Sequence, residues 1–360
     1  MSGVKNQYRI TAVGKQLVEL GLEAFITSNS ANVQYLSGFT GSAGTVVLGA
    51  NGEAILITDS RYTEQAQSQC PGFEIILGGG PNTLKAQFEK IGAKRVGFEP
   101  NHTNVASFER MKAALPEIEF VSAYSIVENV RIIKSEEEIE YIRQAQRVMD
   151  RVFPKLLELV KPGITEFELA TEFMYQVNKA GAQNGLPVPI VASGWRSSLP
   201  HGTASDKKVE YGDFITFDLV VAVKNYKTDM TRTVVVGKAD EKQKAVYETV
   251  LKAQREGIAS MVVGASGVHP DKVARDVINA TEFKDFCFQY GVGHGVGLDV
   301  HERPFMGPYC PDTLAEGMVI TMEPGIYIPG WGGVRIEDVV VVTEKGPEVL
   351  STLATELLIL

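Results

Sequence analysis

Two segments in the second half of the chain place pairs of acidic residues inside runs of apolar residues that read as β-strands. In the first segment, residues 214–223 and 227–236 have the pattern of two strands, and the turn between them lies at residues 224–225. Asp218 and Asp229 stand on either side of this turn, with their midpoint at it. An antiparallel hairpin would therefore place the two carboxylates nearly opposite each other, about 5 Å apart.

The second segment repeats this arrangement with two glutamates. Residues 318–328 and 334–343 read as strands around a glycine-rich turn at 329–333, and Glu323 and Glu337 lie at equal distances from that turn. Like charges directly opposite each other destabilise a sheet, so two such pairs inside apolar strands need compensation. A cation bound between the acids is the simplest compensation.

Two simpler explanations remain open for these four acids. They could face solvent on strands with one polar face, or they could form ion pairs with Arg232 and Arg335, which lie in the same two segments. The occurrence of two symmetric pairs, together with a histidine segment between them, favours a metal site over both explanations.

The histidine segment, residues 291–302, reads Gly-Val-Gly-His-Gly-Val-Gly-Leu-Asp-Val-His-Glu, with glycine at every second position around His294. Glycine lets the backbone approach a site closely and leaves the imidazole accessible. A lone histidine is more often structural, but beside four strand-borne carboxylates His294 is better explained as a metal ligand. Four carboxylates and one imidazole, without thiolates, suit pairs of Mn²⁺, Co²⁺, Fe²⁺ or Zn²⁺. Two such ions about 3.5–4 Å apart activate water near neutral pH, which favours hydrolysis of an amide or ester.

The length of the chain predicts two domains, because it has 360 residues and a domain typically has about 150. Short apolar runs alternate with helical patterns up to about residue 125, which is typical of an α/β domain. Ser135 and Glu138 have the spacing of a capping box and open a long amphipathic stretch, so we expect domains at residues 1–128 and 129–360. In the first domain the expected strands are 24–26, 45–48, 54–57, 73–77 and 96–98, and the expected helices include 62–69 and 105–115.

The balance of charges and the cysteines exclude several classes of function. The chain has 35 Lys and Arg against 44 Asp and Glu, a net charge of −9. This balance argues against nucleic-acid and anionic-membrane partners, because both need basic patches. No run has the length and apolarity of a membrane span, and the first residues lack the apolar stretch of a signal peptide. Cys70, Cys287 and Cys310 are few, odd in number and far apart, which indicates free thiols and a cytoplasmic protein.

The motifs around these residues resemble those of the pita-bread metallopeptidases, in particular the Xaa-Pro aminopeptidases and the Xaa-Pro dipeptidases (prolidases). The resemblance covers nearly the whole chain. It implies an α/β protein in which a creatinase-like N-terminal domain precedes an α+β pita-bread catalytic domain, and an enzyme that hydrolyses Xaa-Pro bonds in short peptides. The motifs in the second half are Phe217-Asp218-Leu219, Thr228-Asp229-Met230-Thr231-Arg232-Thr233, Gly293-His294-Gly295, Met322-Glu323-Pro324-Gly325-Ile326-Tyr327 and Gly333-Val334-Arg335-Ile336-Glu337-Asp338. Segments 35–41 and 58–62 resemble the creatinase-type domain, and segment 190–202 resembles the substrate-facing segment of the family.

The resemblance also implies the cofactor and the residues that hold it. Two divalent metal ions are expected, with Mn²⁺ favoured and Co²⁺, Zn²⁺ or Fe²⁺ as alternatives. The implied ligands are Asp218, Asp229, His294, Glu323 and Glu337.

Further roles follow from the same resemblance. Glu323 would act as general base, and His201 and His301 would line the cleft and stabilise the tetrahedral intermediate. Tyr290 and Arg335 are expected to contact the substrate.

Three departures from the family pattern bear on specificity. Val220 replaces a glycine near the first aspartate, and Tyr290 stands where many relatives have a histidine. Phe305 stands where prolidase-like relatives often have an arginine that grips the carboxylate of a dipeptide, while Arg303 is shifted by two positions. These differences favour an Xaa-Pro aminopeptidase modestly over an Xaa-Pro dipeptidase.

Two other functions stay open on the sequence. One is a non-peptidase hydrolase or lyase on the same fold, and the other is a catalytically inactive pita-bread module that only binds a partner. Both kinds of relative usually lack metal ligands that this chain keeps. The expected partners are short proline-containing peptides and a second copy of the chain in a homodimer, with no nucleic acid and no membrane.

Overall fold

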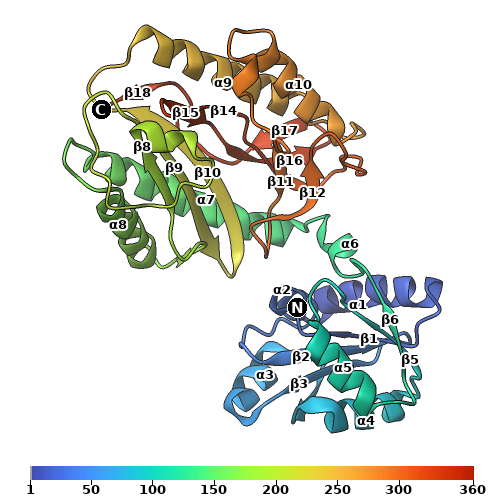
Figure 1. Ribbon diagram of the computed structural model, residues 1–360. Helices are drawn as coiled ribbons and strands as arrows, with labels where there is room; N and C mark the ends of the chain where they lie inside the picture. Colours follow the sequence, from blue (N-terminus) through green and yellow to red (C-terminus); the bar gives the residue numbers. More distant parts are fainter. Residues whose placement is uncertain (1) are drawn as a thin grey trace. The chain divides into compact units, whose positions relative to one another are not determined.

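The computed structural model describes residues 2–360, and side chains from residue 7 onward. The chain forms two compact units, the first ending at Arg131 and the second beginning at Ile132 (Figure 1). Each unit has a hydrophobic core of its own.

The first unit is built on a six-stranded mixed sheet. Its helices are α1 (Ser2–Glu19), α2 (Ser30–Ser37), α3 (Thr63–Gln69), α4 (Gly80–Ile91), α5 (Val105–Ala114) and α6 (Glu128–Arg131), and its strands are β1 (Ala24–Thr27), β2 (Gly44–Gly49), β3 (Ala54–Thr58), β4 (Glu74–Leu77), β5 (Arg95–Phe98) and β6 (Glu119–Ser122). The order in the sheet is β4-β3-β2-β1-β5-β6. The expected strands and helices of this unit are all present within one residue at each end. β6 was not expected, because as a half-exposed edge strand it lacks the continuous apolar run of the buried strands.

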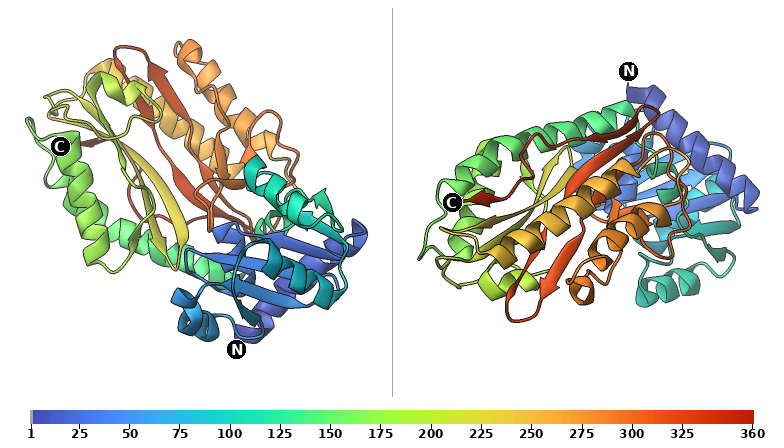
Figure 2. Two further views of the ribbon diagram at one scale, coloured as in Figure 1. Left: turned by 60° about the horizontal axis from the view of Figure 1, so that its bottom comes forward. Right: turned by 90° about the horizontal axis from the view of Figure 1, so that it is seen from above.

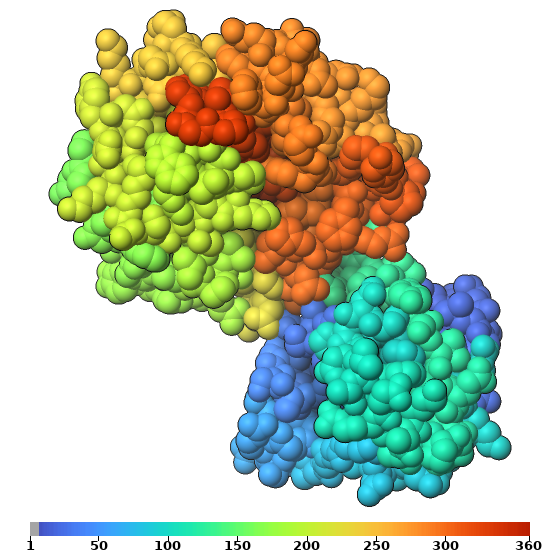
Figure 3. Space-filling view, in the orientation of Figure 1, coloured from blue at the N-terminus to red at the C-terminus, as the bar shows by residue number. Residues whose placement is uncertain are grey.

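The second unit has two five-stranded sheets and a two-stranded ribbon between two layers of helices (Figure 2). Its helices are α7 (Glu136–Leu157), α8 (Glu166–Lys179), α9 (Glu241–Ala259) and α10 (Val268–Asn279). Its strands are β7 (Gln183–Asn184), β8 (Ile190–Ser193), β9 (Phe214–Val223), β10 (Tyr226–Val235), β11 (Gly293–Gly295), β12 (Glu302–Met306), β13 (Val319–Met322), β14 (Gly325–Ile328), β15 (Gly332–Arg335), β16 (Asp338–Thr343), β17 (Gly346–Val349) and β18 (Leu358–Ile359). Figure 3 shows residues 190–235 in yellow-green and the residues after 280 in orange and red, meeting on one face of this unit.

The helices pack on one apolar face of each sheet, so the polar side chains of the strands point to the opposite face. α7 begins at the predicted capping box of Ser135 and Glu138, and together with α8 it covers one face of β9 and β10. The odd-numbered apolar residues of β9 pack into that core, so the even-numbered residues, Asp218 among them, face the other way. α9 and α10 cover the second sheet in the same manner. The two sheets therefore turn their polar faces inward, between the two helix layers.

The first hairpin differs from the prediction by one step of register. β9 and β10 pair around a two-residue turn at Lys224 and Asn225, both of which have positive φ. This turn type fixes the register, and it puts Asp218 opposite Thr231 and Asp229 opposite Val220. The two aspartates are therefore diagonal neighbours on one face of the hairpin. The prediction that they lie nearly opposite each other is therefore off by one step of register, because the turn is centred one residue later than their midpoint.

The second hairpin pairs in the predicted register but is interrupted at the glutamates. β13 pairs with β16 on one side of the gap and β14 with β15 on the other, in a common register that keeps Glu323 and Glu337 at opposing positions. Pro324 has no N–H group for the ladder, which explains the interruption. The freed N–H groups bond elsewhere: Glu323 donates to Val292 O (2.8 Å) and Glu337 to Thr231 O (3.1 Å). These bonds join the second hairpin to the histidine segment and to the first hairpin.

The first unit contains a buried glutamate that has no counterpart in the sequence analysis. Glu99 follows β5 and accepts hydrogen bonds from Thr27 Oγ1 (2.5 Å) and from the Asn32 side-chain amide. Asn32 also donates to Glu128 and accepts from Arg131, so the cluster links β1 and β5 to α6. Burial raises the pKa of Glu99 from its ordinary 4.5 to about 7, in opposition to the hydrogen bonds from Thr27 and Asn32.

This pKa predicts that the first unit loses stability as the pH rises. The folded protein binds the proton of Glu99 more tightly than the unfolded chain does, so the free energy of unfolding falls between about pH 4.5 and pH 7, by up to roughly 3 kcal/mol. Glu99→Gln removes this dependence and should stabilise the protein more at about pH 8 than at about pH 5. Urea unfolding of both proteins at the two pH values measures the difference, and an equal effect at both would contradict the assignment.

Candidate metal centre

One cavity in the second unit collects every site residue that the sequence predicts. It has a volume of about 270 Å³ and lies between the inward faces of the two sheets. Its lining includes the five expected ligands, both expected catalytic histidines and both expected substrate contacts. These nine residues are His201, Asp218, Asp229, Tyr290, His294, His301, Glu323, Arg335 and Glu337, and they are joined by Phe305, Gly291 and Gly293.

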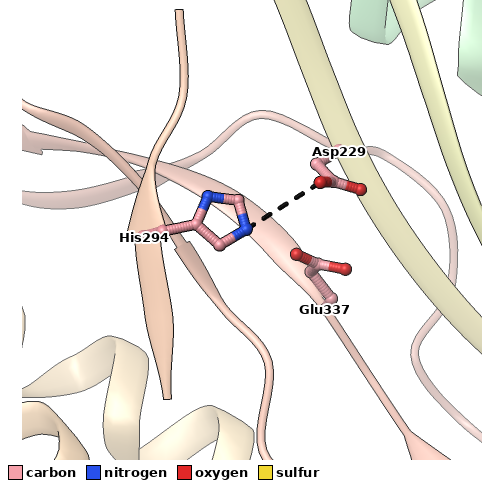
Figure 4. A group of neighbouring side chains, drawn as sticks. All are labelled: Asp229, His294 and Glu337. Carbon is pink, nitrogen blue, oxygen red and sulfur yellow. Dashed lines mark ion pairs between the residues drawn. The ribbon is translucent and has the colours of Figure 1, made fainter. Parts of the chain in front are cut away.

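Asp229, His294 and Glu337 form the core of this arrangement (Figure 4). Each offers a ligand atom, and the three atoms lie within 4.8 Å of one another. His294 Nε2 lies 4.0 Å from Asp229 Oδ2 and 3.3 Å from Glu323 Oε1, so a fourth ligand group reaches the same point. The residues come from β10, from β11, from the residue after β13 and from the gap between β15 and β16.

The imidazole of His294 is prepared to act as a ligand. Its Nδ1 lies 3.1 Å from Gly295 O, and donation of the Nδ1 proton to this carbonyl leaves the lone pair of Nε2 facing the carboxylates. Burial, together with neighbouring His301, lowers the pKa of His294 to about 4. The ring is therefore neutral near physiological pH, which is the form that binds a metal ion.

The acids around it are costly to bury without a cation. Burial and mutual repulsion raise the pKa of Asp229 and Glu323 well above the usual range, and burial with repulsion from Asp218 raises that of Glu337 to about 8. Asp229 Oδ1 and Glu337 Oε1 are buried and have no hydrogen-bond partner among the described residues. Such orphaned carboxylate oxygens are rare in proteins and call for an explanation. The donor set fits divalent metal ions, because hard oxygen atoms and one neutral imidazole nitrogen converge on one point.

Ion pairing, the simpler explanation for the acids, accounts for one of them. Arg335 Nη2 lies 2.5 Å from Asp218 Oδ2, so Asp218 has a cationic partner inside the cavity. Arg232 does not pair with the site acids, since it bonds to Asp338 Oδ1 (2.7 Å) and to the backbone carbonyl of Glu337 (2.7 Å). One arginine thus compensates part of the charge of four carboxylates, and the rest is left for bound cations.

Three hydroxyl groups that sequence reasoning missed orient the predicted residues. Thr231 Oγ1 donates to Glu337 Oε2 (2.7 Å) and accepts from Arg335 Nε (3.1 Å). Thr321 Oγ1 accepts the backbone N–H of His294 (3.0 Å). Thr231 could have been found from the strand period, since it lies two residues after Asp229 and therefore on the same face.

The third hydroxyl, that of Tyr327, connects Arg335 to Tyr290. Arg335 Nη1 donates to Tyr327 Oη (2.8 Å), and Tyr327 Oη lies 2.6 Å from Tyr290 Oη. Tyr327 would keep an unpartnered proton if Tyr290 donated to it, so the favoured direction is from Tyr327 to Tyr290. Burial raises the pKa of Tyr290 well above its usual range, so it stays a neutral phenol. Its own proton is then available to a group inside the cavity.

The remaining predicted residues lie at the rim of the cavity. His201 and His301 are exposed and line it from two different segments, and the His301 ring contacts the His294 ring with 4.3 Å between centroids. Phe305 is about half exposed and also lines the rim. Arg303 forms an ion pair with Asp312 and does not line the cavity.

Val220 stands where the family pattern has a glycine in the first motif, and its side chain is accommodated by the residues around it. Gly185 packs directly against it, and a Cβ on Gly185 would lie 2.1 Å from Val220 Cγ1. The space for this valine therefore comes from a glycine on the neighbouring strand segment.

Comparison with known proteins identifies the families to which the two parts of the chain are similar. The family described as Metallopeptidase family M24 matches residues 140–344, and the Creatinase/Prolidase N-terminal domain matches residues 9–133. The uncharacterized peptidase YqhT of Bacillus subtilis (strain 168) is 42% identical over 344 residues, which cover 95% of this chain and 97% of that protein. The structure of an Xaa-Pro dipeptidase from Bacillus anthracis matches with a TM-score of 0.95 and 37% identity, covering 99% of this chain and 100% of the other. An X-Pro aminopeptidase from Thermotoga maritima MSB8 matches with a TM-score of 0.88 and 36% identity, covering 96% and 99%.

These matches confirm the resemblance that the motifs predicted, both in the two-domain fold and in the class of enzyme. They include a dipeptidase and an aminopeptidase at nearly equal identity, so they leave the choice between the two activities to the residues of the cavity. The chain belongs to metallopeptidase family M24, with a creatinase-type N-terminal domain ahead of its pita-bread catalytic domain.

Proposed function

We propose that the protein hydrolyses the bond between an N-terminal residue and proline in short peptides, with two divalent metal ions held by Asp218, Asp229, His294, Glu323 and Glu337. The observation that carries the proposal is the buried carboxylate cluster, with its unpartnered oxygens, beside a neutral imidazole at the bottom of a cavity. Bound metal ions would polarise the scissile carbonyl and lower the pKa of a water molecule.

The side chains of the cavity supply the proton transfers and the orientation. Glu323 is the proposed general base, which takes a proton from the attacking water and returns it to the proline nitrogen as the bond breaks. Tyr290 offers a phenol proton to the carbonyl oxygen on which negative charge develops. His201 and His301, which line the cavity, would contact the bound peptide and help to stabilise the tetrahedral intermediate.

The lining of the cavity favours peptides longer than two residues. The proline of a dipeptide ends in a free carboxylate, which needs a cationic partner when it enters a partly desolvated site. Among the described lining residues, Arg335 is the one permanently charged cation, and it is already paired with Asp218. Arg303 is paired with Asp312, and Phe305 offers an apolar surface instead. We therefore infer an aminopeptidase preference.

Three further features belong to the same proposal. Mn²⁺ is the favoured metal, because the ligand set is rich in carboxylate oxygen. The cytoplasm is the favoured location, because all three cysteines are free, which suits a reducing compartment. We also propose a homodimer, which the resemblance to the family implies. Among the described residues, no helix is long and apolar enough to cross a membrane.

Metal binding tests the ligand set directly. We expect the metal-free protein to bind two Mn²⁺ ions per chain and to unfold at a higher temperature when they are present. Asp229→Ala or Glu337→Ala should remove at least one ion and abolish activity, because each leaves the cluster short of a ligand. Elemental analysis and calorimetric titration measure the stoichiometry. Glu99→Gln, far from these ligands in the chain, serves as the matched control, and full metal content in both alanine variants would contradict the assignment.

A peptide panel tests the substrate. We expect Xaa-Pro-Xaa tripeptides to be cleaved with a kcat/KM at least about 10-fold higher than Xaa-Pro dipeptides, since a single charge-assisted hydrogen bond is worth about 1.5–3 kcal/mol. Phe305→Arg should reduce this ratio by improving dipeptide cleavage, whereas Phe305→Leu should not. Faster cleavage of dipeptides by the wild-type protein would reverse the preference, and no cleavage of either would favour a non-peptidase reaction.

Tyr290 is tested by removal of one oxygen atom. Tyr290→Phe should lower kcat about 10-fold or more while leaving metal content unchanged, because it removes a donor to the developing negative charge and no ligand. Tyr247→Phe is the matched control, since the Tyr247 hydroxyl is buried and donates to Thr355 O (2.8 Å), a group that does not line the cavity. A loss confined to KM would assign Tyr290 to substrate binding alone.

A further inference from the structure

Two helices of the second unit carry a buried carboxylate in their first turn. Each carboxylate accepts hydrogen bonds from backbone N–H groups of a segment that carries site residues. α8 and α10 belong to the two different helix layers (Figure 1). Each carries an acid in its first turn, Glu166 and Asp271, whose side chains are 0% and 2% exposed. Neither acid lines the cavity, and each pairs with one arginine. The sequence hints at this parallel, because similar glycine-containing turns precede the two helices at residues 160–163 and 263–267.

Glu166 closes the segment that carries His201. One carboxylate oxygen accepts the backbone N–H (2.6 Å) and the hydroxyl (2.9 Å) of Ser193. The other accepts the N–H (3.0 Å) and the hydroxyl (2.7 Å) of Ser205, and also Arg196 Nη1. A single buried carboxylate thus ties together both ends of residues 193–205.

Arg196 extends this closure to the middle of the segment. Its second nitrogen, Nη2, donates to Thr203 O (2.9 Å), while Nη1 stays on Glu166. On the other side, Arg335 Nη1 donates to Pro200 O (3.0 Å). His201 therefore lies between two backbone carbonyls that are each held by an arginine, although its own side chain is exposed.

Asp271 does the same for the segment that leads to His294. Its Oδ1 accepts the backbone N–H of Val292 (3.1 Å), and both of its oxygens accept from Arg275. Arg275 in turn donates to Phe288 O (2.7 Å) and to Tyr290 O. This pair holds the backbone from Phe288 to Val292, which carries Tyr290 and ends two residues before His294.

We propose that Glu166 and Asp271 are positioning residues for two different tasks of the site. Glu166, with Arg196, holds His201 at the substrate side of the cavity, and Asp271, with Arg275, holds Tyr290 and His294 at the metal side. The division of tasks rests on the proposed function. The hydrogen bonds by which each acid closes its segment do not depend on that function. Because the carboxylates are bonded to backbone groups, their loss should release a whole segment and not a single side chain.

The two acids should therefore fail in different ways when they are replaced by their amides. Glu166→Gln should lower kcat/KM for a tripeptide about 10- to 100-fold with two metal ions still bound, since a displaced catalytic group costs about this much. Asp271→Asn should weaken metal affinity by about 10-fold or more, as is typical when a group that orients a metal ligand is lost. Calorimetric titration of the metal-free variants with Mn²⁺ gives the affinity without any activity assay.

Hydrogen exchange of the full-length protein tests the closure itself. Glu166→Gln should speed exchange of the amides in residues 197–205 and leave residues 288–294 unchanged, and Asp271→Asn should do the reverse. Asp150→Asn is the matched control, because Asp150 also accepts several hydrogen bonds, but from Gln146, Ser351 and Thr352, which do not line the cavity and lie outside both segments. Arg196→Lys provides a milder variant that keeps the charge and loses the second contact, should Glu166→Gln unfold.

The outcomes separate this inference from the proposed function. A wild-type protein that cleaves no Xaa-Pro bond would refute the proposed function, yet selective exchange and selective metal loss would still support the two closures. Unchanged exchange in both segments would overturn the inference even in an active enzyme. Equal metal loss in Glu166→Gln and Asp271→Asn would overturn the division of tasks, because it would mean that both acids support one common structure.

Discussion

Repulsion between buried carboxylates is the constraint on which the second unit depends. Asp218, Asp229, Glu323 and Glu337 line one small cavity, and burial together with their mutual repulsion raises the pKa of three of them. Taking one uncompensated charge out of water costs several kcal/mol, which is a large part of the net stability of a typical domain. The surrounding fold therefore has to hold the cluster rigidly, and a bound cation would offset the charge that Arg335 leaves uncompensated.

The fold meets this constraint through the backbone. Glu323 and Glu337 lie at a break in their hairpin, and each uses its freed N–H group to bond a different neighbouring strand. The break therefore costs no unpaired backbone donor, and it joins three separate strand systems at the site. Thr231 then donates to Glu337 Oε2 and leaves Glu337 Oε1 without a partner among the described residues, and Thr321 donates to Glu323 Oε1 (3.4 Å). The same set of contacts therefore makes the site rigid and leaves some carboxylate oxygens without a hydrogen-bond partner.

The sequence was most informative about the two hairpins. The spacing of the acids around each turn was enough to predict that Asp218 lies near Asp229 and Glu323 faces Glu337, and the glycines around His294 indicated that its ring is accessible. The register of β9 and β10 could not be read from a midpoint, because the φ angles of Lys224 and Asn225 decide it. Tyr327, Glu166 and Asp271 were out of reach for a different reason. The groups that they hold in the site are distant along the chain: Tyr290 lies 37 residues from Tyr327, Ser205 lies 39 residues from Glu166 and Val292 lies 21 residues from Asp271. No local pattern encodes such pairs.

Specificity in this fold has to lie outside the metal cluster. Relatives named as dipeptidase and as aminopeptidase match this chain at nearly equal identity over almost its whole length, so a difference in their substrates cannot come from the shared scaffold. One charge-assisted hydrogen bond to a terminal carboxylate contributes about 1.5–3 kcal/mol, which corresponds to about 10- to 160-fold in kcat/KM. A single cation at the rim is therefore sufficient to convert one preference into the other. Under the proposed function, Phe305 at the rim, with Arg303 paired to Asp312, would be such a local change, because it leaves the five proposed ligands in place.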